Sequence, residues 1–229
     1  SMNYAGKQID NLKTVCRDAE ALDVSVHKFA KNIQSFSESN DKRFIVTLSF
    51  EEINKIRKAE MPSESLHNVK KWILIGCDLG QRGEDLLNVS AQNHRIRKGT
   101  LYVDILQQKT GKEVTIPIPS AYTKDLFINE FPYKISLQKL NSYIKDVCEL
   151  AGIDELIEGR KIVVDENKIK RKVLGKYPKY ELITSHAFRR SFATNYYKRN
   201  GISTAVLMEI TGHSREYTFL QYINRQKDK

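Results

Sequence analysis

The chain has 229 residues, 40% of them hydrophobic, with a formal net charge of +10 and a pI of about 9.4. This length allows one large domain, or one domain with part of another. The positive charge indicates a polyanionic partner such as DNA, or an anionic membrane surface. No apolar run approaches the ~20 residues of a transmembrane helix, and no signal peptide opens the chain.

The three cysteines are odd in number and widely separated, without a C-x-x-C pair. Such cysteines are typical of reduced thiols, mostly buried, in a cytosolic protein. We therefore expect a cytoplasmic protein without disulfides.

Residues 4–34 are predicted to be helical, because apolar side chains recur on one stripe from Ile9 to Ala19 and again from Val24 to Ile33. A single helix of this kind cannot bury its stripe alone. The helix either packs on the rest of the chain or is the end of another domain. Residues 35–43 are polar and aperiodic, which predicts a linker.

Ser49-Phe50-Glu51-Glu52 has the capping-box pattern S-x-x-E and predicts a helix to about Lys58, which Met61-Pro62-Ser63 separates from the next helix. Apolar spacing from Leu66 to Gly76 predicts that second helix. Arg82 then follows a glycine turn and precedes a short helix. A surface arginine is the plain alternative to a functional one at this point.

Two β-rich runs, 100–106 and 114–119, are joined by Q-Q-K-T-G-K and predict a hairpin with Thr110-Gly111 in its turn. Lys109 begins the turn, and Lys112 lies close by. Either lysine alone is compatible with an ordinary charged turn.

Helices are predicted at 120–131 and 136–151, the second ending at Gly152. The segment 160–180 then has strand-like runs around Asp165-Glu166-Asn167 and is predicted to be a hairpin. It is strongly basic, which suits either simple solvation or contact with a DNA backbone. Its candidate DNA-binding residues are Lys168, Lys170, Arg171 and Lys172.

The last part of the chain predicts three helices. The first begins at Ser185 as the N-cap and ends at Asn200-Gly201. It carries His186 and Arg189 three residues apart, on one face near its start. A short helix at 204–211 ends at Gly212, and a last helix from about residue 215 carries Tyr222 two turns in.

These residues form a pattern: H-A-F-R, then G-H at Gly212-His213, then Tyr222 nine residues after that histidine. The pattern resembles the C-terminal signature of tyrosine recombinases, the phage-type integrases. A longer segment around this histidine and arginine resembles integrases of mobile elements in Bacteroidetes-type bacteria: K-Y-E-L-I-T-S-H-A-F-R-R-S-F-A-T-N-Y-Y-K-R. Arg82 lies in G-x-R-x-x-D, similar to the family's first arginine motif, although the family more often has an apolar residue where Gln81 stands.

The resemblance implies an α+β fold, mainly α, with a small antiparallel β-sheet: the integrase catalytic-domain fold. It implies that Tyr222 attacks a DNA phosphodiester. The implied catalytic set is Arg82, Lys109, His186, Arg189, His213 and Tyr222, supported by Asp85. Lys112 and Arg190 join the basic residues of 160–180 as candidate DNA contacts. The chemistry implied requires no cofactor, metal or ATP.

The resemblance also implies the domain organisation. Residues 1–34 would be the C-terminal helix of a core-binding domain, 35–43 the linker, and 44–229 the catalytic domain. The implied partner is double-stranded DNA at recombination sites, bound as a tetramer by the full-length protein, with this fragment monomeric and no membrane involved.

Two other functions share these motifs. A decayed integrase would bind DNA without cleaving it, and a type IB topoisomerase would use the same chemistry without a second duplex. The complete set of six residues favours an active enzyme. Tyr196, Tyr197 and Tyr217 are rival nucleophiles, and only Tyr222 has the nine-residue offset from His213.

Overall fold

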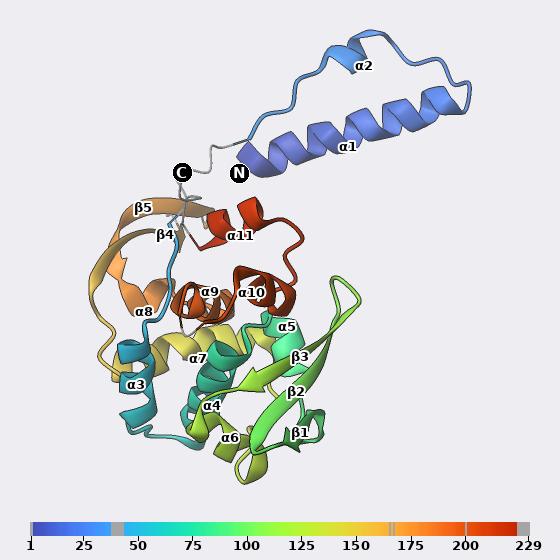
Figure 1. Cartoon of the computed structure of the whole chain (residues 1–229). Coiled ribbons are helices and arrows are strands. Elements are labelled where there is room, and N and C mark those ends of the chain that lie inside the picture. Colours follow the sequence, from blue (N-terminus) through green and yellow to red (C-terminus); the bar gives the residue numbers. More distant parts are fainter. Residues whose placement is uncertain (1, 38–43, 165, 167, 200, 224–229) are drawn as a thin grey trace. The chain divides into compact units, whose positions relative to one another are not determined.

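The computed structural model describes residues 2–37, 44–164, 166, 168–199 and 201–223 (Figure 1). The chain divides into two compact units, Ser1–Arg43 and Phe44–Lys229. No helix within the described residues is long and apolar enough to cross a membrane.

The first unit contains α1 (Met2–Ala21) and the short α2 (Phe29–Asn32). The prediction of helix throughout residues 4–34 was therefore wrong between the two. The break follows from the residues there: Asp23 adopts a left-handed conformation with φ of 59°, and the β-branched Val24 and Val26 follow it. The expected linker falls largely on residues 38–43, outside the described residues, and the assignment of this unit to a core-binding domain stays a prediction.

The second unit is mainly helical. It contains α3 (Phe50–Lys58), α4 (Glu64–Leu79), α5 (Gly83–Leu87), α6 (Ala121–Ile128), α7 (Leu137–Leu150), α8 (Lys179–Leu182), α9 (Ser185–Tyr196), α10 (Thr204–Ile210) and α11 (Glu216–Tyr222), with a 3₁₀ turn at Ala91–Asn93. The capping box predicted at Ser49 is present: its side chain accepts from the Glu52 amide, and the Glu52 carboxylate accepts from the Ser49 amide.

The strands form two separate antiparallel groups. A three-stranded sheet has the order β1 (His94–Arg97), β2 (Thr100–Gln107), β3 (Lys112–Ile118), and a two-stranded ribbon pairs β4 (Leu156–Val164) with β5 (Lys170–Pro178). Both predicted hairpins are confirmed, but β1 was not foreseen from the sequence. The predicted turn residues Asp165 and Asn167 lie outside the described residues. Figure 1 shows the sheet and the ribbon on different sides of the helices.

Helix α4 is the centre of the core, and α7 and α9 pack against it. Phe188 and Phe192 of α9 are buried as their spacing predicted, and Phe188 lies against Gly76 of α4, where an added Cβ would approach its ring to 2.6 Å. A fully buried phenylalanine stabilises a fold by about 3–5 kcal/mol relative to alanine. This close approach fixes α9, and with it the functional residues near its start.

The ends of α9 differ from the prediction. Thr184, one residue before Ser185, is the N-cap, and its side chain makes no capping bond. The side chain of Asn141 on α7 instead accepts from the Ser185 amide at 2.8 Å. The helix stops at Tyr196 rather than near residue 200, and Lys198 has a left-handed φ of 54°. Of the predicted stop, Gly201 has a φ of 71°, and Asn200 lies outside the described residues.

Other predictions for the helices agree in part. Gly212 ends α10 with a φ of 59°, and Tyr222 is the last residue of α11 as predicted, whereas the helix predicted at 120–131 already ends at Ile128. Cys16 of the first unit and Cys77 and Cys148 of the second are free thiols, the last two buried.

Candidate active site

Tyr222 stands at the centre of a cluster of histidine and arginine side chains from different elements. Its ring centroid lies 5.5 Å from that of His186 on α9 and 4.9 Å from that of His213 in the turn after α10. The guanidinium carbon of Arg190 lies 5.2 Å from the Tyr222 ring centre, a cation–π distance. Segments far apart in the sequence therefore converge on one phenol.

Arg82 enters this cluster from the turn between α4 and α5. The turn is possible because Gly80 adopts a left-handed φ of 62° at the C-cap of α4. Arg82 is the N-cap residue of α5, and its Nη1 lies 3.7 Å from Oδ2 of the buried Asp85. The other carboxylate oxygen, Oδ1, accepts from the backbone amide of Gln108 at 2.9 Å. Asp85 thus connects the arginine turn with the β2–β3 turn.

Arg189 projects from the first turns of α9 and is 2% exposed. Its Nη1 donates to the Gly80 carbonyl at 3.2 Å, so the arginine turn and α9 are joined directly. Burial lowers the pKa of Arg189 to about 10, against the opposing effect of Tyr222. The guanidinium remains protonated at neutral pH and is available to a phosphate.

The orientation of His213 is set by Thr211. The buried Thr211 hydroxyl donates to the Leu207 carbonyl and lies 2.8 Å from Nδ1 of His213. Because its only proton is used, the hydroxyl must accept from Nδ1–H, which leaves Nε2 as the unprotonated nitrogen of the neutral ring. Burial, followed by the charges of Arg189 and Arg82, lowers the pKa of His213 to about 4.

His186 packs its ring nearly perpendicular to that of Tyr222, with an interplanar angle of 83°. Desolvation of the ring, followed by the charges of Arg190, Arg189 and Arg82, lowers its pKa to about 4, although the residue as a whole is exposed. Both histidines are therefore neutral at pH 7.

Burial raises the pKa of the Tyr222 phenol, and the charges of Arg189, Arg190 and Arg82 oppose this rise. Burial dominates, so the phenol stays protonated at neutral pH. Among the described residues, Tyr222 Oη and Arg190 Nε are buried atoms without a hydrogen bond of ordinary length, and Arg82 Nη1 faces Asp85 Oδ2 at 3.7 Å. Buried polar atoms are normally paired, so these donors in one cluster indicate a place for a ligand with anionic oxygens.

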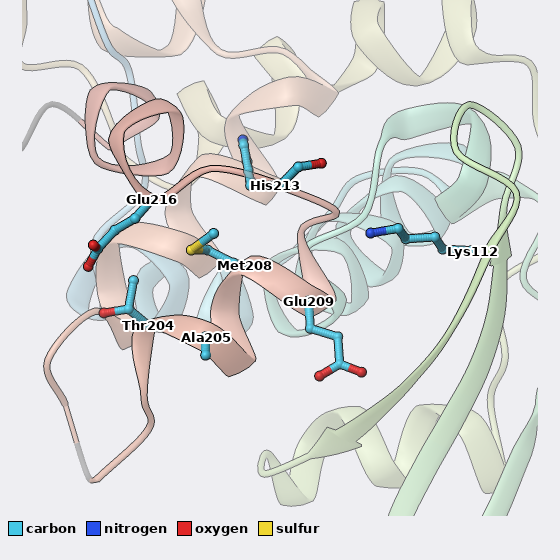
Figure 2. A pocket seen from close by; sticks show the side chains of 8 residues that line it. Lys112, Thr204, Ala205, Met208, Glu209, His213 and Glu216 are labelled. Carbon is cyan, nitrogen blue, oxygen red and sulfur yellow. The ribbon is translucent and has the colours of Figure 1, made fainter.

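The two candidate lysines lie outside this cluster. Lys109 is exposed in the β2–β3 turn, and its link to the site is through its neighbour Gln108. Lys112, at the start of β3, lines a cavity of about 650 Å³ together with His213 and Glu209. Figure 2 shows the Lys112 side chain reaching from β3 toward α10 and the His213 turn.

The candidate DNA contacts fall into two places. Lys168, Lys170, Arg171 and Lys172 are exposed at one end of the β4–β5 ribbon. Arg190 is half-buried against Tyr222 instead, so the structure places it within the cluster. Among the rival tyrosines, Tyr217 is 69% exposed, Tyr196 packs on Phe192, and Tyr197 packs near Phe219.

Sequence reasoning gave no role to three residues of the site. Thr211 orients His213, and Gln81 and Gln107 form a buried pair beneath the arginine turn. The only signal in the sequence was Gln81, a polar residue where an apolar one was expected.

Comparison with known proteins supports the integrase resemblance. Residues 120–229 match the sequence model of the phage integrase family. No curated protein sequence matches the chain.

Among solved structures, a lambda integrase (75–356) dimer bound to a COC′ core site has a TM-score of 0.61 at 20% identity, covering 96% of this chain and 74% of that one. A lambda integrase tetramer bound to a Holliday junction has a TM-score of 0.62 at 19% identity, covering 96% and 60%. The XerH site-specific recombinase bound to difH has a TM-score of 0.57 at 18% identity, covering 85% and 54%.

The chain thus spans about half the length of XerH and three-fifths to three-quarters of the lambda integrase chains. The predicted fold class, α+β and mainly α, is confirmed by the observed elements and by these likenesses. Residues 120–229 are similar to the phage integrase family, and the chain shares its fold with lambda integrase and the XerH site-specific recombinase.

Proposed function

We propose that the chain is the catalytic domain of a site-specific DNA recombinase in which Tyr222 is the nucleophile. The observation that carries this proposal is the position of the Tyr222 hydroxyl: it is buried, makes no hydrogen bond of ordinary length, and has the rings of two histidines and the charges of three arginines close to it. A buried structural tyrosine normally satisfies its hydroxyl, so this arrangement supports a hydroxyl that contacts a substrate.

In the proposed step, Tyr222 Oη forms a bond to phosphorus and the bond from phosphorus to the 5′-oxygen breaks. The products are a 3′-phosphotyrosyl bond and a 5′-hydroxyl. Arg82, Arg189 and His213 hold the non-bridging oxygens, where negative charge grows in the pentavalent transition state. A bound phosphate also changes the environment of the Tyr222 phenol, because the buried donors around it then make direct contacts with the phosphate oxygens.

Two protons move in this step. Lys109 gives one to the leaving 5′-oxygen as a general acid, with Lys112 as the alternative donor. The phenol of Tyr222 loses the other. His186, in ring contact with Tyr222, either accepts that proton or orients the phosphate. The phosphotyrosine keeps the energy of the broken bond, so attack by a 5′-hydroxyl of a partner duplex reverses the step without ATP or metal.

The β4–β5 ribbon offers a backbone-binding surface for the same DNA. Its exposed Lys170, Arg171 and Lys172 carry charge that suits phosphate contacts without sequence specificity. The similar lambda integrase structures, a dimer on a core site and a tetramer on a Holliday junction, support assembly of the full-length protein on DNA. Action on DNA also places the protein in the bacterial cytoplasm.

The test is covalent capture. The protein is incubated with a pool of labelled duplexes that carry one nick, with randomised sequence on both sides of it. Cleavage near the nick releases a short strand, which cannot diffuse back, so the phosphotyrosyl adduct accumulates. We expect a protein–DNA adduct that survives denaturant, and sequencing of its DNA identifies the site.

Retention of the pool without any adduct would contradict the proposal and favour a non-catalytic DNA-binding domain. An enzyme of the type IB topoisomerase class would instead relax supercoiled plasmid without joining two duplexes. A second assay with two labelled selected duplexes separates these outcomes, because only a recombinase yields the hybrid product.

A further inference from the structure

Two glutamine side chains meet in the interior beneath the site. Gln81 and Gln107 are 26 residues apart in sequence, and both are completely buried. Nε2 of Gln107 donates to Oε1 of Gln81 at 2.8 Å. Burying two amides is costly unless each polar atom is paired, so the partners of these groups decide what the pair does.

Every amide hydrogen and oxygen of the pair has a partner. Both Nε2 atoms donate to the Ile210 carbonyl at 2.9 Å, and Gln81 Nε2 also donates to the Leu79 carbonyl. Oε1 of Gln107 accepts from the Thr110 hydroxyl at 2.9 Å. Rotating either amide by half a turn would set its oxygen against a carbonyl oxygen, so this network has one orientation.

The Ile210 carbonyl belongs to the last turn of α10, where carbonyls have no partner within the helix. The two glutamines therefore cap α10. Gly212, two residues later, allows the close approach: a Cβ there would lie 2.5 Å from Gln107 Oε1, and its φ of 59° favours glycine.

Three chain segments meet at this network, and each carries a residue of the proposed chemistry. Gln81 directly precedes Arg82, Gln107 lies two residues before Lys109, and Ile210 lies three residues before His213. The turn that carries Lys109 is otherwise exposed. Its base is held by Gln107 and by the Gln108 backbone amide, which donates to the Asp85 carboxylate.

We infer that the Gln81–Gln107 pair is a positioning device that holds the base of the β2–β3 turn against the arginine turn and the end of α10, so that Lys109 reaches the leaving oxygen. This inference rests on the proposed function. The plain alternative is that the pair only fills and stabilises the core. An apolar pair would fill the same volume, but it would not fix one register between the three segments.

The two roles differ in one chemical consequence. When the bond from phosphorus to the 5′-oxygen breaks, the oxygen must take a proton from Lys109, because the conjugate acid of an alkoxide has a pKa comparable to the ~15.7 of water. If sulfur replaces this oxygen, the leaving group is a thiolate, whose conjugate acid has a pKa of about 8.5. A thiolate leaves without a proton donor, so a misplaced Lys109 no longer matters.

The experiment uses Gln107→Met, which keeps volume and removes the amide, with the duplex selected by covalent capture. That duplex is made in two forms, with oxygen or sulfur at the 5′-bridging position. We expect adduct formation to fall about 100-fold on the oxygen substrate and to stay within about threefold of wild type on the sulfur substrate. Lys109→Ala should show the same difference in adduct formation between the oxygen and sulfur substrates. An equal loss on both substrates would overturn the inference.

Asn68→Leu is the matched control. Asn68 is also a buried amide that holds a distant segment: its side chain donates to the Tyr133 carbonyl at 3.0 Å and accepts from the Tyr133 amide at 2.9 Å. Its loss should destabilise the fold without any difference between the oxygen and sulfur substrates. A difference in this control would show that general destabilisation, rather than positioning, produces the effect.

Amide hydrogen exchange tests, without any cleavage, whether the Gln81–Gln107 pair holds the β2–β3 turn in place. Gln107→Met should accelerate exchange at the amides of Gln108 and Gly111, and Asn68→Leu should leave them unchanged. Unchanged exchange in Gln107→Met would overturn the inference even if cleavage fell. If covalent capture with the randomised pool yields no adduct from wild-type protein but the turn exchanges faster in Gln107→Met, the proposed function fails, whereas the role of the glutamine pair in holding the β2–β3 turn stands.

Discussion

The ring centroid of His213 lies 4.9 Å from that of Tyr222. The two residues are nine positions apart in the sequence, with His213 in the turn after α10 and Tyr222 at the end of α11. Phe219, one turn before Tyr222, also packs on the same imidazole, with ring centroids 5.5 Å apart. The spacing that marks the sequence motif thus has a physical meaning. Nine residues are enough for a short loop followed by two turns of helix α11, which brings the phenol of Tyr222 back to the ring of His213.

Thr211→Val should lower the rate of adduct formation about 10-fold without preventing DNA binding, because it removes the acceptor that holds Nδ1–H of His213. The rate is measured by single-turnover capture with the selected duplex. Thr194→Val is the control, since the buried Thr194 hydroxyl has no hydrogen-bond partner. Equal rates in the two variants would contradict the role of Thr211.

Variants of Asp85 distinguish its contribution to stability from its contribution to catalysis. Asp85→Asn keeps an oxygen for the Gln108 amide but removes the negative charge that faces Arg82. We expect stability within about 1 kcal/mol of wild type and a rate of adduct formation about 10-fold lower.

Asp85→Ala is the companion variant and should also lose about 1–3 kcal/mol in urea unfolding, because it takes the acceptor from the part-buried Gln108 amide and leaves a cavity where the buried Asp85 side chain stood. Wild-type rates in Asp85→Asn would show that the carboxylate charge does not position Arg82.

The pKa of His213 predicts how stability depends on pH. In the unfolded chain its pKa is about 6.5, whereas the folded value is lowered to about 4. Between these values the unfolded chain binds more protons at this histidine, so the contribution of His213 to the free energy of unfolding falls as pH falls from about 6.5 toward 4. Urea unfolding of the wild type and of His213→Asn at pH 7, 5.5 and 4.5 separates this contribution from those of other groups, such as Asp78, whose pKa burial raises to about 6. His213→Asn, which does not titrate, should lose less stability over the same range, and identical losses would contradict the assignment.

Gly80 supports the arginine turn by combining a left-handed φ with contact to Phe192, to whose ring an added Cβ would approach within 2.4 Å. Gly152 has a similar φ of 67° but open space around it. Gly152→Ala should therefore cost about 1 kcal/mol from backbone strain alone. Gly80→Ala should cost clearly more in urea unfolding, because strain and overpacking add. Equal costs would mean that Phe192 moves aside freely.

Much of this arrangement could be predicted from local signals. The capping box at Ser49, the glycine turn before Arg82 and the offset between His213 and Tyr222 are encoded within a few residues of one another. These features depend on backbone preferences and helical period, which a sequence displays directly.

Features that depend on distant partners were missed. The start of α9 is set by Asn141, 44 residues away, which is why Ser185 was wrongly taken as the N-cap. The partners of the Gln81–Gln107 pair likewise come from three segments. The raised pKa of Tyr222 likewise reflects burial, which only the folded structure reveals.

The central claim is that Tyr222 attacks DNA, and the most direct measurement is mass spectrometry of the captured adduct after protease and nuclease digestion. We predict a nucleotide attached to the peptide that contains Tyr222, and no adduct from Tyr222→Phe, which should still bind DNA. Attachment to Tyr217, to another side chain, or an undiminished adduct in Tyr222→Phe would contradict the account.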